Sequence, residues 1–327
     1  MNAPTLWSRR LATLFGLLIL SGSALAQAGA YPDKPIRFIV PYPPGGGTDV
    51  VARIVQARFQ QALGQQIVIE NKGGAGGSVG TEQAAKSAAD GYTVLFTLSS
   101  HTINPAIFPK LNFDTARDFE PVGTVASLPQ ILVSSPQFAA NTVAEMTALA
   151  KAKPGTVQFA SVGNGSPGHL AGELQALRTG VSLTHIPYRG GGPAVTDTIG
   201  GQVSTLWVSI PAAAQFVKTG KLKALAVSTV KRSAAFPNVP TMQEAGVADF
   251  EVDSWYAMFV PAKTPRTVID RLNKALNEVT ADPEVRERLL AQGAEAVGGT
   301  PEALGRVVAA ELPKWAKLAK DANIKPD

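Results

Sequence analysis

The sequence contains no cysteine and only three histidines, and these shortages exclude several kinds of site. Without cysteine the protein has no disulfide, no thiolate metal site and no cysteine nucleophile. An exported lipoprotein needs a cysteine directly after its signal peptide, so we expect no lipid anchor. The three histidines, His101, His169 and His185, lie far apart without the spacing of metal ligands, which predicts that the protein binds no metal.

Long apolar runs are also missing, apart from a short one near the start. Residues 9–10 are arginines, residues 11–20 are mostly apolar, and residues 21–26 are small and end in Ala-Leu-Ala. This order is typical of a secretory signal peptide, and a run of about 15 Å spans only half of a bilayer core. We predict cleavage after Ala26, with Ala28 as the alternative, and a soluble periplasmic product. The arginine pair also fits a twin-arginine signal, but no bulky aromatic directly follows it, which favours the general export route.

The charge excess is small. The chain has a net charge of +5, and removal of the two signal-peptide arginines lowers it to +3. Such an excess suits an anionic small ligand, whereas nucleic-acid binding requires a basic stripe with aromatic platforms. About 300 residues remain after cleavage, enough for two domains of ordinary size.

Short β-rich runs alternate with helical stretches along the mature chain, which predicts an α/β fold with a mainly parallel sheet covered on both faces. The expected strands are 36–40, 67–70, 93–98, 157–161, 183–187, 205–209 and 222–227. The expected helices are 48–63, 79–88, 143–151, 169–177, 193–199, 213–218, 267–280, 283–292 and 301–320.

A pattern that occurs twice in the sequence indicates where the chain crosses between domains. Residues 131–151 and 258–279 both read as strand, proline, loop and helix. We therefore expect crossings near Leu128 and Ser254. Domain 1 would then comprise residues 31–127 plus 254–327, and domain 2 residues 128–253. The alternative is that any two βα units look alike.

Four glycine-rich loops lie between a predicted strand and the following helix, at residues 41–49, 71–78, 161–169 and 188–194. Glycines let backbone N–H groups approach a ligand, and the helix N-terminus adds partial positive charge. In open parallel sheets, ligands bind at these carboxyl ends. The loops together predict a site for an anion, although each alone also fits a tight turn.

Two enzymatic alternatives are weaker. Gly163, Gly165 and Gly168 match a dinucleotide fingerprint, but the acidic residue expected about 20 positions later is missing. We therefore predict no cofactor. Ser166 and His169 could form the core of a secreted hydrolase, but no carboxylate is placed to orient the histidine. We predict a protein without catalytic residues.

The ordered motifs resemble those of the Bug-type receptors of tripartite tricarboxylate transporters over essentially the whole mature chain. The motifs that carry the resemblance include Val40-Pro41-Tyr42-Pro43-Pro44-Gly45-Gly46-Gly47-Thr48-Asp49, His101-x-Ile103-Asn104-Pro105, Gly163-x-Gly165-Ser166-x-x-His169-Leu170-Ala171-Gly172-Glu173 and Pro187-Tyr188-Arg189-Gly190-x-x-Pro193-Ala194. The resemblance implies a two-domain periplasmic-binding-protein fold (Venus flytrap, type II) with a ligand cleft between the domains.

The resemblance also implies a set of ligand-binding residues for a small carboxylate. Those in domain 2 would be Gly163, Gly165, Ser166, His169, Tyr188, Gly190, Gly191, Pro193 and Ala194. Those in the closing domain 1 would be Tyr42, Gly45, Gly46, Gly47, Thr48, Asp49, Ser99 and His101. Two positions depart from the family pattern: Gly73 where proline is frequent, and Val208 where an acid is frequent, which makes an amino-acid ligand less expected.

These observations predict a monomeric solute-binding receptor that captures a mono-, di- or tricarboxylic or aromatic acid and delivers it to membrane permease subunits. A sensor that presents its ligand to a signalling system would have the same binding features. The hydrolase based on Ser166 is the third alternative.

Overall fold

The computed structural model describes residues 31–45, 47–108, 110–188, 190–322 and 324. The predicted signal peptide, residues 1–26, and two residues of the predicted loops, Gly46 and Arg189, lie outside the described residues. Residues Lys34–Asp327 cluster into one compact unit, so the proposed division into two domains stays a prediction. Within the described part of the chain, no helix is both long and apolar enough to cross a membrane.

Ten strands form the sheet, which has two parallel ends and an antiparallel centre. Its order is β2-β1-β3-β9-β4-β7-β5-β6, and β8 and β10 also pair with β4. The strands are β1 (Ile36–Val40), β2 (Ile67–Asn71), β3 (Thr93–Leu98), β4 (Phe119–Ser134), β5 (Gln158–Ser161), β6 (Thr184–Pro187), β7 (Thr205–Ser209), β8 (Lys223–Val227), β9 (Asp253–Pro261) and β10 (Glu295–Gly298). The pairs of β1 with β2 and β3, and of β5 with β6 and β7, are parallel, as expected for βαβ units.

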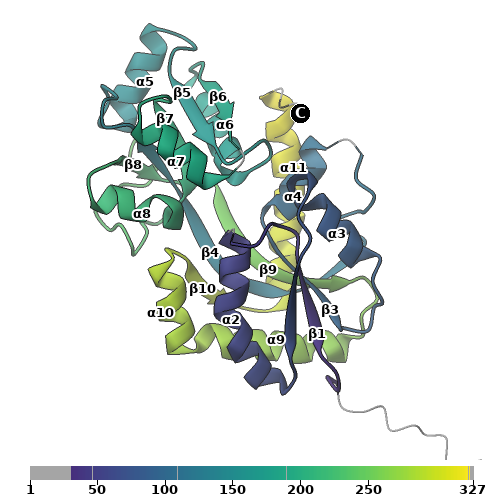
Figure 1. Ribbon diagram of the computed structural model, residues 1–327. Helices are drawn as coiled ribbons and strands as arrows, with labels where there is room; N and C mark the ends of the chain where they lie inside the picture. Colours follow the sequence, from purple (N-terminus) through teal and green to yellow (C-terminus); the bar gives the residue numbers. More distant parts are fainter. Residues whose placement is uncertain (1–30, 46, 109, 189, 323, 325–327) are drawn as a thin grey trace, which may run out of the picture. The chain divides into compact units, whose positions relative to one another are not determined.

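Strand β4 belongs to both ends of the sheet. From Phe119 to Pro129 it pairs with β9, and from Gln130 to Ser134 it pairs with β7 (Figure 1). The last β9 pair joins Asp253 to Pro129, close to the predicted crossings at Leu128 and Ser254. The strand pairing therefore divides into a first half, built on β1, β2, β3 and β9, and a second half, built on β5, β6, β7 and β8.

The helices begin and end within a few residues of the predicted bounds. They are α2 (Gly47–Leu63), α3 (Ser78–Ala85), α4 (Ser100–Ile107), α5 (Val143–Ala152), α6 (Pro167–Thr179), α7 (Gly191–Ile199), α8 (Ile210–Lys218), α9 (Arg266–Ala281), α10 (Pro283–Ala291) and α11 (Pro301–Asp321). Asp282 and Thr300 cap α10 and α11 by accepting hydrogen bonds from the backbone N–H three residues on. Helix α4 was not predicted.

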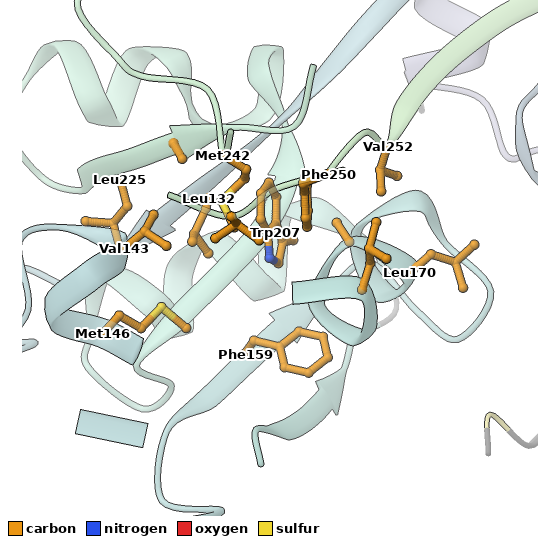
Figure 2. Close-up of a cluster of buried hydrophobic side chains, with 14 of the residues drawn as sticks. Leu132, Val143, Met146, Phe159, Leu170, Trp207, Leu225, Met242, Phe250 and Val252 are labelled. Atoms are coloured by element: carbon orange, nitrogen blue, oxygen red, sulfur yellow. The ribbon is translucent and has the colours of Figure 1, made fainter. Parts of the chain in front are cut away.

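Trp207 lies at the centre of a core cluster of buried hydrophobic side chains (Figure 2). Its indole stacks on Phe250 at 5.7 Å, and its Nε1 donates to Gln175 Oε1 at 3.0 Å. The same cluster includes Ile103 of α4 and Trp315 of α11. Helix α4 also contacts β3, and helix α11 also contacts β4. Trp207 is thus a core residue rather than an exposed stacking platform.

Candidate functional site

Asp49 holds the first glycine-rich loop in place with its carboxylate. Oδ2 accepts from Gly45 N at 2.8 Å and from Arg53 Nε at 2.9 Å, and Oδ1 accepts from Asn71 Nδ2 at 3.0 Å. Although burial opposes ionisation, these hydrogen bonds and the nearby guanidinium lower the pKa of Asp49. The carboxylate is therefore engaged inside the loop, and the predicted contact of Asp49 with a ligand stays a prediction.

Two tyrosines connect this loop to the strands beneath it. A Cβ added at Gly47 would lie 2.7 Å from the Tyr256 hydroxyl, and one added at Gly77 would lie 2.8 Å from the Tyr42 hydroxyl. Burial raises the pKa of Tyr42 to about 12, against the smaller effect of neighbouring Ser100 and Thr97 hydroxyls. The first and second loops therefore approach each other through Tyr42, which stays a neutral hydroxyl donor.

Asn104 of α4 links the second loop to the third. Its Nδ2 donates to Gly76 O at 2.9 Å. A Cβ added at Gly165 would lie 3.7 Å from Asn104 Oδ1 and 3.4 Å from Ile107 Cδ1. Side chains of α4, the helix that follows β3 in the first half, thus reach the third loop. Sequence reasoning left Asn104 out of the site, although it stands in one of the quoted motifs.

The third and fourth loops meet at their backbones. Tyr188 N donates to Ser161 O at 3.0 Å, and a Cβ added at Gly163 would lie 3.3 Å from Tyr188 O. Gly163 and Gly190 have φ values of 131° and 113°, which strongly favour glycine. The four loops therefore form one connected set of contacts, and are not spread over distant surfaces.

Side chains of the third and fourth loops mostly stabilise the loops themselves. Ser166 Oγ accepts from His169 N at 3.2 Å as the N-cap of α6, and Tyr188 donates to Asp197 Oδ2 at 2.8 Å. Ala194 is fully buried in the core, whereas Pro193 is exposed. The two hydroxyls therefore hold their own loops, and the backbone N–H groups of Gly163, Gly165 and Tyr188 also donate within the two loops.

His101 points away from the loops. Its ring lies 4.6 Å from the Phe259 ring and 5.0 Å from that of Phe119, and neither ring nitrogen has a hydrogen-bond partner. Burial lowers its pKa to about 3. The His101 side chain therefore packs in the core, and its predicted contact with a ligand stays a prediction. Ser99 is also buried, and its Oγ lies 3.3 Å from Ser254 Oγ.

The hydrolase alternative has no support in the arrangement around Ser166, whose hydroxyl serves as a helix cap. The nearest approach of a serine hydroxyl to an imidazole in this region is Ser161 Oγ to His185 Nε2, at 2.7 Å, and Ser161 is fully buried. Among the described residues, no group of three or more His, Cys, Asp or Glu side chains is arranged to hold a metal ion.

Comparison with known proteins assigns the fold and the family. Residues 51–324 match the family model described as "Tripartite tricarboxylate transporter family receptor" (TctC). The chain is 39% identical to Protein BugT of Bordetella pertussis over 320 residues, which cover 97% of this chain and 98% of BugT. These matches extend over nearly the entire length of both proteins.

Two solved structures share the fold, which is that of two-domain periplasmic binding proteins. R. palustris Rpa4515, solved with adipate, superposes with a TM-score of 0.83 at 33% identity and covers 91% of this chain and 100% of its own. MatC from Rhodopseudomonas palustris, solved with bound malate, gives a TM-score of 0.79 at 32% identity, covering 88% and 99%.

Proposed function

Because the chain belongs to the TctC family of solute-binding receptors, we propose that it captures a small carboxylate in the periplasm and delivers it to the permease subunits of a tripartite transporter. The ligand carboxylate contacts the loops 161–169 and 188–194. Loop 41–49 and α4 close over it from the other half of the sheet. Adipate and malate, the ligands of the two related structures, indicate the class of acid to test first.

The observation that carries this proposal is the meeting of two helix N-termini at glycine-rich loops. Helix α6 begins at Pro167 and α7 at Gly191, and the loops before them touch at Gly163 and Tyr188. A carboxylate that leaves water must replace its lost hydrogen bonds, and clustered backbone N–H groups with helix-terminal charge provide such donors. This arrangement binds an anion without a fixed positive side chain.

Ligand capture in this proposal follows from a hinge between the two halves of the sheet. Strand β4 runs through the point at Pro129 and Gln130 where its partner changes from β9 to β7, and β9 begins beside that point at Asp253. A ligand that contacts loops of both halves favours the closed arrangement by its additional contacts there. A receptor of this kind binds with micromolar or tighter affinity, about −8 kcal/mol or better.

The proposal is tested by thermal unfolding of the purified mature protein with a panel of mono-, di- and tricarboxylates that includes adipate and malate. At a ligand concentration of about 100 times Kd, binding stabilises the protein by ~2.7 kcal/mol and raises the melting temperature by several degrees. The matching diamides serve as controls, since they keep the ligand's shape but lack the charge. A panel in which no acid raises the melting temperature, or in which acids and amides act alike, contradicts the proposal.

A pair of glycine variants tests where the acid binds. Gly163 in the third loop and Gly180 at the C-terminus of α6 both have positive φ, so alanine strains the backbone at either end of the same helix. We expect Gly163→Ala to weaken binding at least tenfold and Gly180→Ala to leave it nearly unchanged. Equal effects would place the site elsewhere. Recovery of the unaltered acid after incubation distinguishes a receptor from a hydrolase.

A further inference from the structure

Three aromatic rings form a continuous stack beneath the third loop. The His169 and His185 rings are nearly parallel, with centroids 3.9 Å apart and an interplanar angle of 7°. Phe159 stacks on the other face of His185, at 4.8 Å and 24°. Phe159 and His169 are buried, so the stack has a fixed position relative to β5 and α6. Of these three rings, only that of His169 belongs to the expected ligand-binding set.

His169 uses one ring nitrogen to hold the loop. Its Nδ1 accepts a hydrogen bond from Gly165 N at 3.2 Å, and this requires an unprotonated Nδ1. The ring proton therefore resides on Nε2, from which the Glu173 carboxylate lies 3.6 Å away. The Gly165 N–H, which belongs to a loop expected to bind the ligand, is thus engaged by His169.

His185 acts on the same loop through a serine. Ser161 Oγ donates to Gly163 O at 3.1 Å and accepts from Gly163 N at 3.2 Å. The hydroxyl has one proton. When it is donated to Gly163 O, the 2.7 Å contact between His185 Nε2 and Ser161 Oγ uses a proton on Nε2, and when it is donated to Nε2, His185 is the acceptor. Burial, with a smaller effect of His169, lowers the pKa of His185 to about 3, which is consistent with a neutral ring.

We propose that His169 and His185 are positioning residues that fix the peptide groups of Gly165 and Gly163 and so set the geometry of the ligand-binding loop. This role rests on the proposed function of the loop in carboxylate capture. The two histidines have different tasks: His169 is an acceptor at Nδ1, and His185 bonds to Ser161 through Nε2. Neither ring contacts the ligand. The stack holds both rings in the orientation that these hydrogen bonds need.

Amide side chains can test each nitrogen separately, because asparagine places its polar atoms near the position of Nδ1 and glutamine near that of Nε2. At position 169, His169→Asn should keep the acceptor for Gly165 N, and His169→Gln should lose it. At position 185 the order reverses: His185→Gln should keep the hydrogen bond to Ser161, and His185→Asn should lose it. A role in packing alone does not produce this crossed pattern.

The readout is amide hydrogen exchange of Gly165 and Gly163 in the mature protein without ligand, followed by NMR. We expect exchange to accelerate about fivefold or more in His169→Gln and His185→Asn, the factor of one ordinary hydrogen bond, and to stay close to wild type in the other two variants. Indistinguishable results for asparagine and glutamine at either position overturn the proposal for that histidine. If a variant fails to fold, the ¹⁵N shifts of the wild-type rings decide, and a proton on Nδ1 of His169 overturns the assignment.

Affinity for adipate, or for whichever panel acid gives the largest shift in melting temperature, provides a second readout. Binding should weaken at least fivefold in the two variants that lose the hydrogen bond, with recovery in their partners. The two proposals fail in different ways. A wild-type protein that binds no acid contradicts the proposed function, whereas the exchange of Gly163 and Gly165 still decides whether the histidines position the loop.

Discussion

Replacement of Asp253 by asparagine should remove a pH-dependent loss of stability. Asp253 lies where β4 changes its partner from β9 to β7. Asp253 is the first residue of β9 and pairs with Pro129. Ser127 Oγ lies 2.9 Å from both of its carboxylate oxygens. Burial, assisted by the negative charges of Glu251 and Glu311, raises the pKa of Asp253 to about 6, against the opposing effect of Ser127.

The size and sign of the effect follow from this pKa. An unfolded aspartate ionises near 3.8, so between pH 3.8 and about 6 the folded state holds a proton that the unfolded state has lost. The proton on Asp253 therefore contributes stability that is fully present below pH 3.8. This stability is lost as the pH rises through about 6. Each pKa unit corresponds to ~1.4 kcal/mol, so the change approaches about 3 kcal/mol.

Asparagine resembles the protonated acid and does not ionise, so the variant does not lose this stability as the pH rises. We therefore expect Asp253→Asn to exceed wild type in unfolding free energy at pH 7.5 by about 2–3 kcal/mol, and to match it near pH 4. Urea unfolding at both pH values measures the difference. Glu278→Gln, at an exposed position on α9, controls for the removal of a negative charge. A difference between wild type and Asp253→Asn that is the same at both pH values would refute the reasoning.

Two further predictions concern packing and burial. Gly172→Ala should destabilise the protein by about 1–3 kcal/mol, because the new Cβ would lie 2.0 Å from Phe159 Cε2. Gly305→Ala, whose Cβ would meet only Pro121 at 3.7 Å, should stabilise α11 by up to about 1 kcal/mol. Denaturant unfolding measures the change in unfolding free energy of both variants, and a change of the same sign in both would contradict this argument. Wild-type protein should lose about 2 kcal/mol between pH 6.5 and pH 5 relative to His101→Leu, because the folded state cannot protonate His101. A pH-independent difference in unfolding free energy would show that the ring is accessible to protons.

The regular βα units were predictable because their signals are local. The strands 36–40, 93–98 and 205–209 are confirmed at the expected positions. The antiparallel centre was not predicted, because β4 contains Pro121, Gly123 and Pro129, which read as strand breakers, and its partners come from distant parts of the chain. Helix α4 was missed since Pro105 interrupts its pattern.

The glycine-rich loops were predictable as a set, but the direction of each side chain was not. Asp49 and His101 stand in segments expected to bind a ligand, yet the Asp49 carboxylate accepts from its own loop and the His101 imidazole lies among phenylalanines. The Gly165 amide likewise donates to His169. Such orientations depend on partners far away in sequence, so spacing alone does not reveal them. The contacts of these loops with a ligand stay predictions.

The shared strand β4 has a consequence for exchanging specificity between relatives. A chimera that takes residues 130–252 from another receptor would import both glycine-rich loops of the second half while interrupting the backbone at only two joints, before Gln130 and before Asp253. The graft would not be independent of its host, since Ile103 and Trp315 of the recipient pack into the same core as Trp207. Successful transplants should therefore come from donors whose residues facing those two side chains have matching volumes, whatever acid the donor captures.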